Sequence, residues 1–282
     1  MKKMFIFIVI LSLFSCQKKV IKNRLKTSVE MEPLTLDNRK NANLVSSAFL
    51  FMLYSGLTEF HPSGKTTLAL AKSYTLSEDK KTYKFILKDN IKWSDGKPIT
   101  AYDFEKSWKK ILDPTFPSLC PQLLFIILNA EEAKNGKCSL DKVGIKALDE
   151  KTLLVNLKHP CPYFFTITSF CILFPIPTHI DEKYPNWAEN YSENFVCSGP
   201  FKLKSWEHEN KIIVEKNENF WNKENVSIDS IEVAIIKNEN IILQLFEDKK
   251  LDWLGSLYNS FPIDIIPTII KKEGALIINL FK

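Results

Sequence analysis

The sequence predicts a mixed α/β protein, because segments with a strand pattern alternate along the chain with segments with a helix pattern. Residues 83–88 approximate the alternation of polar and apolar side chains that a half-buried strand shows. Residues 201–206 and 211–216 have strand character and flank the polar stretch 207–210, which predicts a hairpin or two adjacent strands. A further apolar run of strand length covers residues 231–236.

The best-defined helix is expected directly after Thr100. Thr100 can cap its first turn, and Asp103 stands three residues later, where a reciprocal capping carboxylate belongs. The next apolar residues recur at helical spacing and form one stripe: Phe104, Trp108, Ile111 and Leu112. The helix should end before Pro114, because the residue that precedes a proline avoids helical geometry.

Two further helices are predicted from apolar spacing. The first covers residues 44–53 and is expected to end near Gly56, which would serve as its C-terminal cap. The second is short and amphipathic, and its apolar face consists of Ile241, Ile242, Leu245 and Phe246.

The first 16 residues have the features of an export signal. Lys2 and Lys3 precede an uncharged apolar run, residues 4–14, which would span roughly 16 Å as a helix. That is too short to cross a hydrocarbon core of about 30 Å, so residues 1–16 are interpreted as a signal peptide. The mature protein is then expected to be exported, to the periplasm or another extracytoplasmic site.

The signal ends in Leu13-Phe14-Ser15-Cys16, which resembles the bacterial lipobox, although Phe14 is bulkier than the usual residue there. The resemblance implies lipidation of Cys16, and a diacyl anchor is sufficient for stable membrane attachment. The alternative is an ordinary signal peptide followed by a chance cysteine.

Charge and cysteine content exclude several classes of protein. Removing the signal takes two lysines from 38 Lys and Arg, against 33 Asp and Glu, so the net charge falls from +5 to about +3. Charges of both signs are interspersed, so no nucleic-acid partner is expected. The remaining cysteines lack zinc or thioredoxin spacing; they are Cys120, Cys138, Cys161, Cys171 and Cys197. A Cys161–Cys171 bridge is one interpretation, and buried, unpaired cysteines are the favoured one.

Enzymatic activity is not predicted. Neither a His-Glu-x-x-His nor a Gly-x-Ser-x-Gly motif occurs. The four histidines, His61, His159, His179 and His208, are dispersed without metal-ligand spacing. No cofactor is therefore expected.

A family resemblance covers the chain from about residue 30 to its last residue. It is carried by short motifs in order: EPLTLD (32–37), LYSGLT (53–58), YKFIL (83–87), WSDGKPITAYDF (93–104) with Trp108, VGIKAL (143–148), PYF (162–164), PIP (175–177), SGPFKL (198–203) and KNENFW (216–221). Together these motifs resemble family 5 of the bacterial extracellular solute-binding proteins of ABC importers, and its oligopeptide-binding members most closely.

The resemblance implies an α/β, periplasmic-binding-protein-like fold of type II, in the three-domain class. Domain I would consist of residues 17–54 and 178–282, and domain II would be the inserted residues 55–177. Domain III, the opposite lobe of the ligand cleft, is expected to be absent from this sequence.

The resemblance also implies ligand contacts in two segments. Members of the family hold an extended peptide between lobes, chiefly through main-chain hydrogen bonds. The first expected segment is a strand edge with Asn41, Ala42, Asn43 and Leu44; Ala42 stands where a relative has a glutamate, which removes a charge there. The second contains Tyr258, Asn259 and Ser260, and the alternative for Tyr258 and Asn259 is a surface loop.

The predicted function is that of the substrate-binding component of an ABC importer for oligopeptides, with the permease subunits as partners. Because the resemblance places the partner of the peptide amino group on domain III, peptide binding is expected to be impaired or to depend on a separate second-lobe polypeptide. The alternative is a lipoprotein with a structural or interaction role unrelated to transport.

Overall fold

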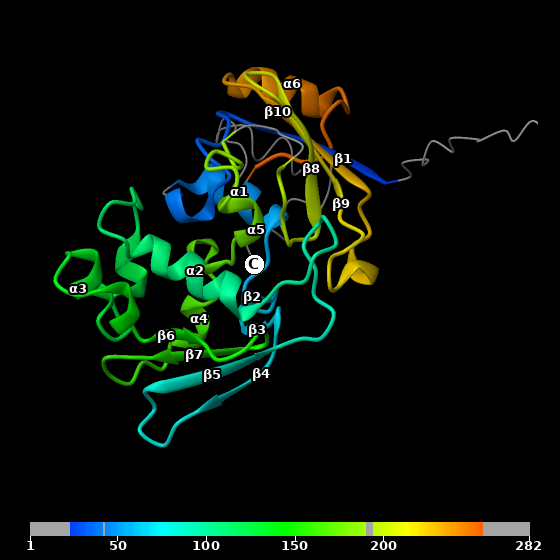
Figure 1. The fold of residues 1–282 in the computed structure, drawn as a ribbon. Coiled ribbons are helices and arrows are strands. Elements are labelled where there is room, and N and C mark those ends of the chain that lie inside the picture. The colour runs from blue at the N-terminus through cyan, green and yellow to red at the C-terminus, as the bar shows by residue number, and fades with distance from the viewer. Residues whose placement is uncertain (1–22, 42, 190–193, 256–282) are drawn as a thin grey trace, which may run out of the picture.

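The computed structural model describes residues 23–41, 43–189 and 194–255, and it contains two four-stranded sheets (Figure 1). The first sheet has the strand order β1 (Arg24–Val29), β10 (Ser230–Ile235), β9 (Lys211–Lys216) and β8 (Phe201–Glu207). Strand β1 runs parallel to β10, and the other pairs are antiparallel. The first sheet therefore joins segments about 200 residues apart in the sequence.

The second sheet is built from one continuous part of the chain. Its order is β4 (Ala71–Leu76), β5 (Thr82–Leu87), β7 (Thr152–Asn156) and β6 (Ile145–Ala147), with all neighbours antiparallel. Helix α2 (Ala101–Ile111) packs on β6 and β7. A two-stranded ribbon of β2 (Thr58–Phe60) and β3 (Thr66–Leu68) precedes this sheet in the sequence.

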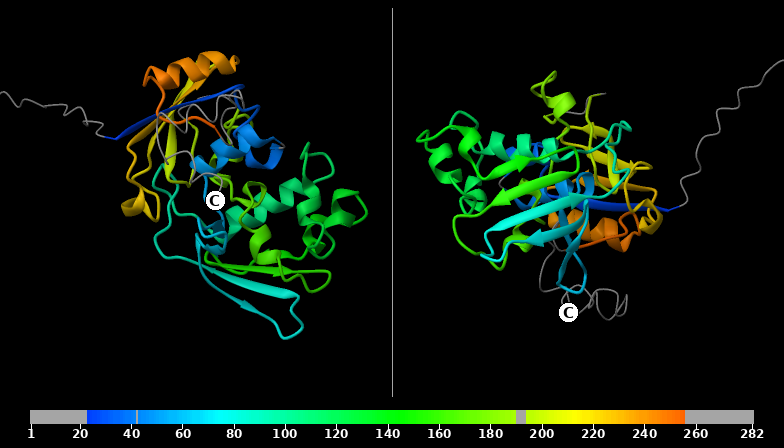
Figure 2. Two further views of the ribbon diagram at one scale, coloured as in Figure 1. Left: turned by 180° about the vertical axis from the view of Figure 1, so that it is seen from behind. Right: turned by 60° about the horizontal axis from the view of Figure 1, so that its bottom comes forward.

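Short helices fill the space around the sheets (Figures 1 and 2). The α-helices are α1 (Leu44–Leu53), α3 (Ala130–Lys134), α4 (Phe164–Ile167), α5 (Thr178–Asp181) and α6 (Glu239–Glu247). The 3₁₀ turns are η1 (Asn38–Lys40), η2 (Pro121–Leu124), η3 (Leu140–Lys142), η4 (Cys171–Leu173) and η5 (Lys223–Asn225). Helix α1 and turn η4 are in contact, and one continuous apolar core extends from the first sheet to the second.

The strand and helix predictions are confirmed where the pattern was strongest. The predicted strand 83–88 corresponds to β5, the pair 201–206 and 211–216 forms the β8–β9 hairpin, and 231–236 corresponds to β10. Helix α2 begins with the predicted capping box of Thr100 and Asp103. Its apolar stripe, Phe104, Trp108, Ile111 and Leu112, is fully buried. The short helix is α6, although only Ile242 of its apolar residues is buried.

The predicted role of Gly56 is wrong. Helix α1 covers Leu44–Leu53 as expected, but Tyr54 is its C-terminal cap and has an extended backbone. Gly56 lacks the positive φ of a left-handed cap, and it is required for space instead. A Cβ atom at this position would lie 2.6 Å from the Cε1 atom of Phe174.

The five described cysteines are unpaired, as the favoured interpretation predicts; three of them are buried, whereas Cys120 and Cys138 are half-buried. Cys161 and Cys171 are both buried with free thiols, so the bridge between them is not formed. Burial raises the pKa of the Cys197 thiol to about 12 and also raises the pKa of Cys171, so both thiols are protonated at neutral pH. Among the described residues, no helix is long and apolar enough to span a membrane.

Candidate ligand-binding site

The described residues of the first predicted ligand segment, Asn41, Asn43 and Leu44, connect η1 to the start of α1. The backbone is extended at Asn41 (φ −72°, ψ 140°) and at Asn43 (φ −128°, ψ 159°), and Leu44 is the first residue of α1. The described residues of this segment belong to neither sheet, so the expected strand is absent there. Ala42 lies outside the described residues. Whether the segment contacts a ligand stays a prediction.

The two asparagines hold this turn in place. The Asn41 amide donates to the hydroxyl of Ser47 (2.8 Å) and to the Sγ of Cys171 (3.4 Å). Its Oδ1 accepts from the backbone N–H of Asn43 (3.2 Å), and Asn43 Oδ1 caps α1 by accepting from Ser46 N–H (2.7 Å). Both side chains are therefore engaged within the protein. The side chain of Leu44, by contrast, is 70 % exposed.

A buried ion network fixes the base of the same turn. The Arg39 guanidinium donates to Asp37 (2.8 and 2.9 Å) and to Asp181 of α5 (2.6 and 2.9 Å). Burial alone would raise the pKa of Asp181, but the hydrogen bonds and positive charge of Arg39 outweigh it and hold that pKa below its usual value. Asp181 also accepts from the indole N–H of Trp187 (3.0 Å). The network thus fixes the turn that leads into Asn41 against α5.

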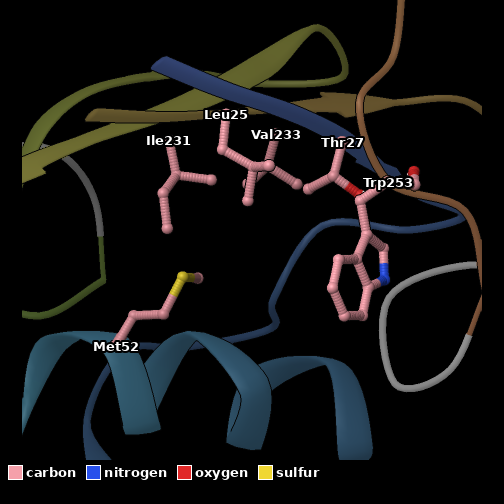
Figure 3. A pocket seen from close by; sticks show the side chains of 6 residues that line it. All are labelled: Leu25, Thr27, Met52, Ile231, Val233 and Trp253. Atoms are coloured by element: carbon pink, nitrogen blue, oxygen red, sulfur yellow. Dashed lines mark hydrogen bonds between the residues drawn. The ribbon is translucent and has the colours of Figure 1, made fainter. Parts of the chain in front are cut away.

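The second predicted segment, Tyr258, Asn259 and Ser260, lies outside the described residues. The chain just before it is attached to β1, because Asp252 N–H donates to the Lys26 carbonyl (2.7 Å) and Asp252 Oδ2 accepts from Lys26 N–H (2.7 Å). Trp253 follows and faces the interior between β1 and α1 (Figure 3).

An apolar cavity of about 190 Å³ lies between the first sheet and α1 (Figure 3). Its walls are Leu25 and Thr27 of β1, Met52 of α1, Ile231 and Val233 of β10, and Trp253. A dry cavity of about 150 Å³ can hold a benzene ring, so this one has room for one apolar group of that size. Sequence reasoning missed this site; the alternating apolar residues of the two paired strands were the available signal.

Two histidines of the described chain pair with single carboxylates. His179 Nε2 pairs with Asp95 Oδ2 (2.7 Å), and His208 Nδ1 pairs with Glu32 Oε2 (2.9 Å), at separate places. Asp103 caps α2 and accepts from the Thr178 hydroxyl (2.6 Å). Within residues 23–41, 43–189 and 194–255, no group of His, Cys, Asp and Glu side chains could hold a metal ion.

Comparison with known proteins identifies the class. The family model described as "Bacterial extracellular solute-binding proteins, family 5 Middle" matches residues 65–275, most of the chain. The chain therefore belongs to that family of solute-binding proteins, and the predicted periplasmic-binding-protein-like fold is confirmed by solved structures of its members.

Two similar proteins of Bacillus subtilis are peptide-binding proteins. The chain is 38 % identical over 255 residues to the oligopeptide-binding protein of Bacillus subtilis, covering 90 % of this chain and 47 % of the relative. It is 35 % identical over 223 residues to a dipeptide-binding protein of the same organism, covering 79 % of this chain and 41 % of the relative. The chain thus spans about half the length of these curated relatives.

The fold of the chain is also similar to solved structures of oligopeptide-binding proteins. A periplasmic oligopeptide-binding protein from Borrelia burgdorferi matches with a TM-score of 0.83 and 35 % identity, covering 89 % of this chain and 50 % of the other. The Haemophilus influenzae oligopeptide-binding protein in complex with the peptide RPPGFSPFR matches with a TM-score of 0.83 and 28 % identity, covering 89 % and 48 %.

Proposed function

We propose that this chain is the substrate-binding component of an ABC importer for oligopeptides. The observation that supports this best is the 38 % identity to an oligopeptide-binding protein over 90 % of the chain. In this proposal Asn41, Ala42, Asn43 and Leu44, together with Tyr258, Asn259 and Ser260, contact the peptide. The family is one of solute-binding proteins, and we expect no catalytic activity.

The turn at residues 41–44 supports recognition through the peptide backbone. The backbone is extended at Asn41 and Asn43, and both asparagine side chains are used internally, so selectivity for particular ligand side chains should be low at this point. Ala42 brings no charge to the ligand. The partner of the peptide amino group would have to come from domain III, which we propose lies outside this sequence.

We further propose that peptide binding by this chain alone is weak. In this proposal the chain contains only domain I (residues 17–54 and 178–282) and the inserted domain II (residues 55–177), which together form one lobe. Two-lobed binding proteins enclose their ligand by closing, and one lobe leaves the peptide half solvated. Independent binding is then expected in the millimolar range, about −4 kcal/mol. A separate second-lobe polypeptide or the permease subunits would increase the affinity for the peptide.

The experiment is an NMR titration of ¹⁵N-labelled residues 17–282 with penta-alanine. Concentration-dependent shifts in residues 41–44 with a millimolar Kd are expected. The absence of shifts at about 20 mM peptide would contradict peptide binding. Micromolar binding by the chain alone would instead contradict its dependence on a partner. A pull-down with the chain as bait tests the transport role. If the chain binds peptide but captures no permease subunits, the alternative of a lipoprotein outside transport is favoured.

The proposed location is extracytoplasmic, with the mature chain anchored through a lipid on Cys16. The supporting observation is the short apolar segment that ends in Leu13-Phe14-Ser15-Cys16. Cells that express the chain should incorporate a labelled fatty acid into it, and the label should be lost in Cys16→Ser. Equal labelling of both proteins would contradict this assignment.

A further inference from the structure

Three phenylalanines from distant parts of the chain form one exposed aromatic patch: Phe51 of α1, Phe60 of β2, and Phe170 just before η4. They are 40 %, 47 % and 40 % exposed. The rings of Phe51 and Phe60 lie 6.4 Å apart, and those of Phe60 and Phe170 lie 5.5 Å apart, both edge to face. If each side chain has about 200 Å² of surface, the patch exposes roughly 250 Å².

Such a patch requires an explanation. Single exposed apolar residues are common on soluble proteins, and the largest contiguous apolar patch of a typical monomer, about 300–600 Å², is often functional; the three rings alone approach that size. The addition of Leu44, which is 70 % exposed and lies two turns before Phe51 on the same face of α1, extends the apolar surface further.

The base of the patch is held by buried contacts. Phe51 packs edge to face on the buried Phe174 at 5.7 Å, and Gly56 provides the space for that ring. The β2–β3 ribbon is bonded to the chain that leads to Phe170, because Thr58 Oγ1 and Thr168 Oγ1 lie 2.8 Å apart. The Thr66 hydroxyl donates to Thr166 Oγ1 (3.2 Å). The three rings are therefore presented at fixed spacing.

The patch adjoins the predicted ligand segment. The Asn41 amide bonds both Ser47 and Cys171; Ser47 lies one helical turn before Phe51, and Cys171 directly follows Phe170. From Leu44 to Phe51 helix α1 rises about 10 Å. An extended peptide covers that distance in about three residues. A peptide bound at the turn can thus reach the patch along the exposed face of α1.

We propose that the aromatic patch binds a bulky apolar side chain of the peptide ligand, about three residues along from the residue paired with the turn at 41–44. The inference rests on the proposed function and specifies its substrate class: peptides of at least four residues with an aromatic or large aliphatic side chain at that distance. The patch is an uncharged aromatic surface, so it would select for apolar area rather than for charge.

The test compares penta-alanine with five variants that carry one phenylalanine at successive positions, in NMR titrations of residues 17–282. One position should lower the Kd about 10- to 100-fold, the range expected for burial of one aromatic side chain. Phe60→Ser and Phe170→Ser should abolish this preference and leave the Kd for penta-alanine unchanged. Tyr163→Ser is the control, because Tyr163 is an aromatic residue outside the patch that is 62 % exposed.

The outcomes separate the two proposals. If penta-alanine binds but phenylalanine gives no advantage at any position, the patch is not a subsite, while the proposed function stands. If the preference survives in both serine variants, the apolar side chain binds elsewhere and the inference is wrong. Binding of no peptide at all would contradict the proposed function and this inference with it. Unchanged far-UV circular dichroism of the serine variants would show that they fold.

Discussion

The regions around the two sheets differ in how the chain builds them and in how completely they are packed. The second sheet uses the continuous stretch from β4 to β7, and its apolar stripe on α2 is fully buried. The first sheet joins β1 to strands about 200 residues later and leaves a cavity of about 190 Å³ between itself and α1. The candidate ligand turn, the cavity and the aromatic patch all involve α1 or its two ends.

The largest effect is expected from removing the ion network at the base of the ligand turn, in the region of the first sheet. Arg39→Leu leaves the buried carboxylate of Asp37 and the partly buried carboxylate of Asp181 without their cation, and such a loss costs about 3–5 kcal/mol. Lys40→Leu removes the more exposed pair with Glu189 and should cost about 1 kcal/mol or less. Urea denaturation measures both. Similar values for the two variants would show that the network does not hold the turn.

Matched leucine truncations compare the packing of the two sheets. Leu153→Ala in β7 creates a void in a fully buried position and should cost about 3 kcal/mol. Leu25→Ala in β1 removes a half-buried side chain that already borders the cavity and should cost about 1–2 kcal/mol. The free energies of unfolding from denaturant titration give the comparison. A larger loss at Leu25 would contradict the looser packing of the first region.

Gly56→Ala tests the tight contact between the end of α1 and Phe174. The new methyl group would meet the buried ring of Phe174 at 2.6 Å, so the variant should lose about 1–3 kcal/mol. In Gly64→Ala the added methyl meets open space, and only the positive φ of 80° opposes it, at about 1 kcal/mol. Thermal unfolding distinguishes the two. If Gly56→Ala were more stable than the parent protein, the lower conformational entropy of its unfolded chain would outweigh any clash with Phe174.

The smallest expected effect concerns acid stability in the second region. The hydrogen bonds from Lys110 and from Thr115 lower the pKa of Asp113 to about 2. Because this pKa is below its unfolded value, the ionised group contributes stability above about pH 4 that is lost as the pH falls toward 2. Asp113→Asn should therefore be less stable at pH 6 but lose less stability between pH 4 and 2. Parallel pH profiles of unfolding for both proteins would contradict this.

Local patterns were enough to predict much of the scaffold. Thr100, Asp103 and the apolar stripe of α2 act within a few residues of each other, so their spacing in the sequence is their spacing in space. The prediction for Gly56 failed because a glycine after a helix can serve either as a cap or as a close contact. Only Phe174, 118 residues later in the sequence numbering, decides between them.

Only the part of the candidate site that consists of consecutive residues was predicted from the sequence. The segment at Asn41 and Asn43 was identified by family resemblance, but its expected strand is a turn capped by its own side chains. The Arg39 network, the cavity and the aromatic patch were all missed. Each one assembles residues from two to four distant segments, and a single sequence does not show which distant segments meet.

By itself, the sequence determined the mixed α/β class, the start of α2, the β8–β9 hairpin and the family, because each depends on short-range spacing or on motifs in a fixed order. The tertiary structure alone decided that β1 pairs with β10, that Arg39 reaches Asp181, and that three phenylalanines meet beside the candidate ligand turn. These contacts depend on packing between residues far apart in the chain, where apolar burial selects partners that local propensity cannot specify.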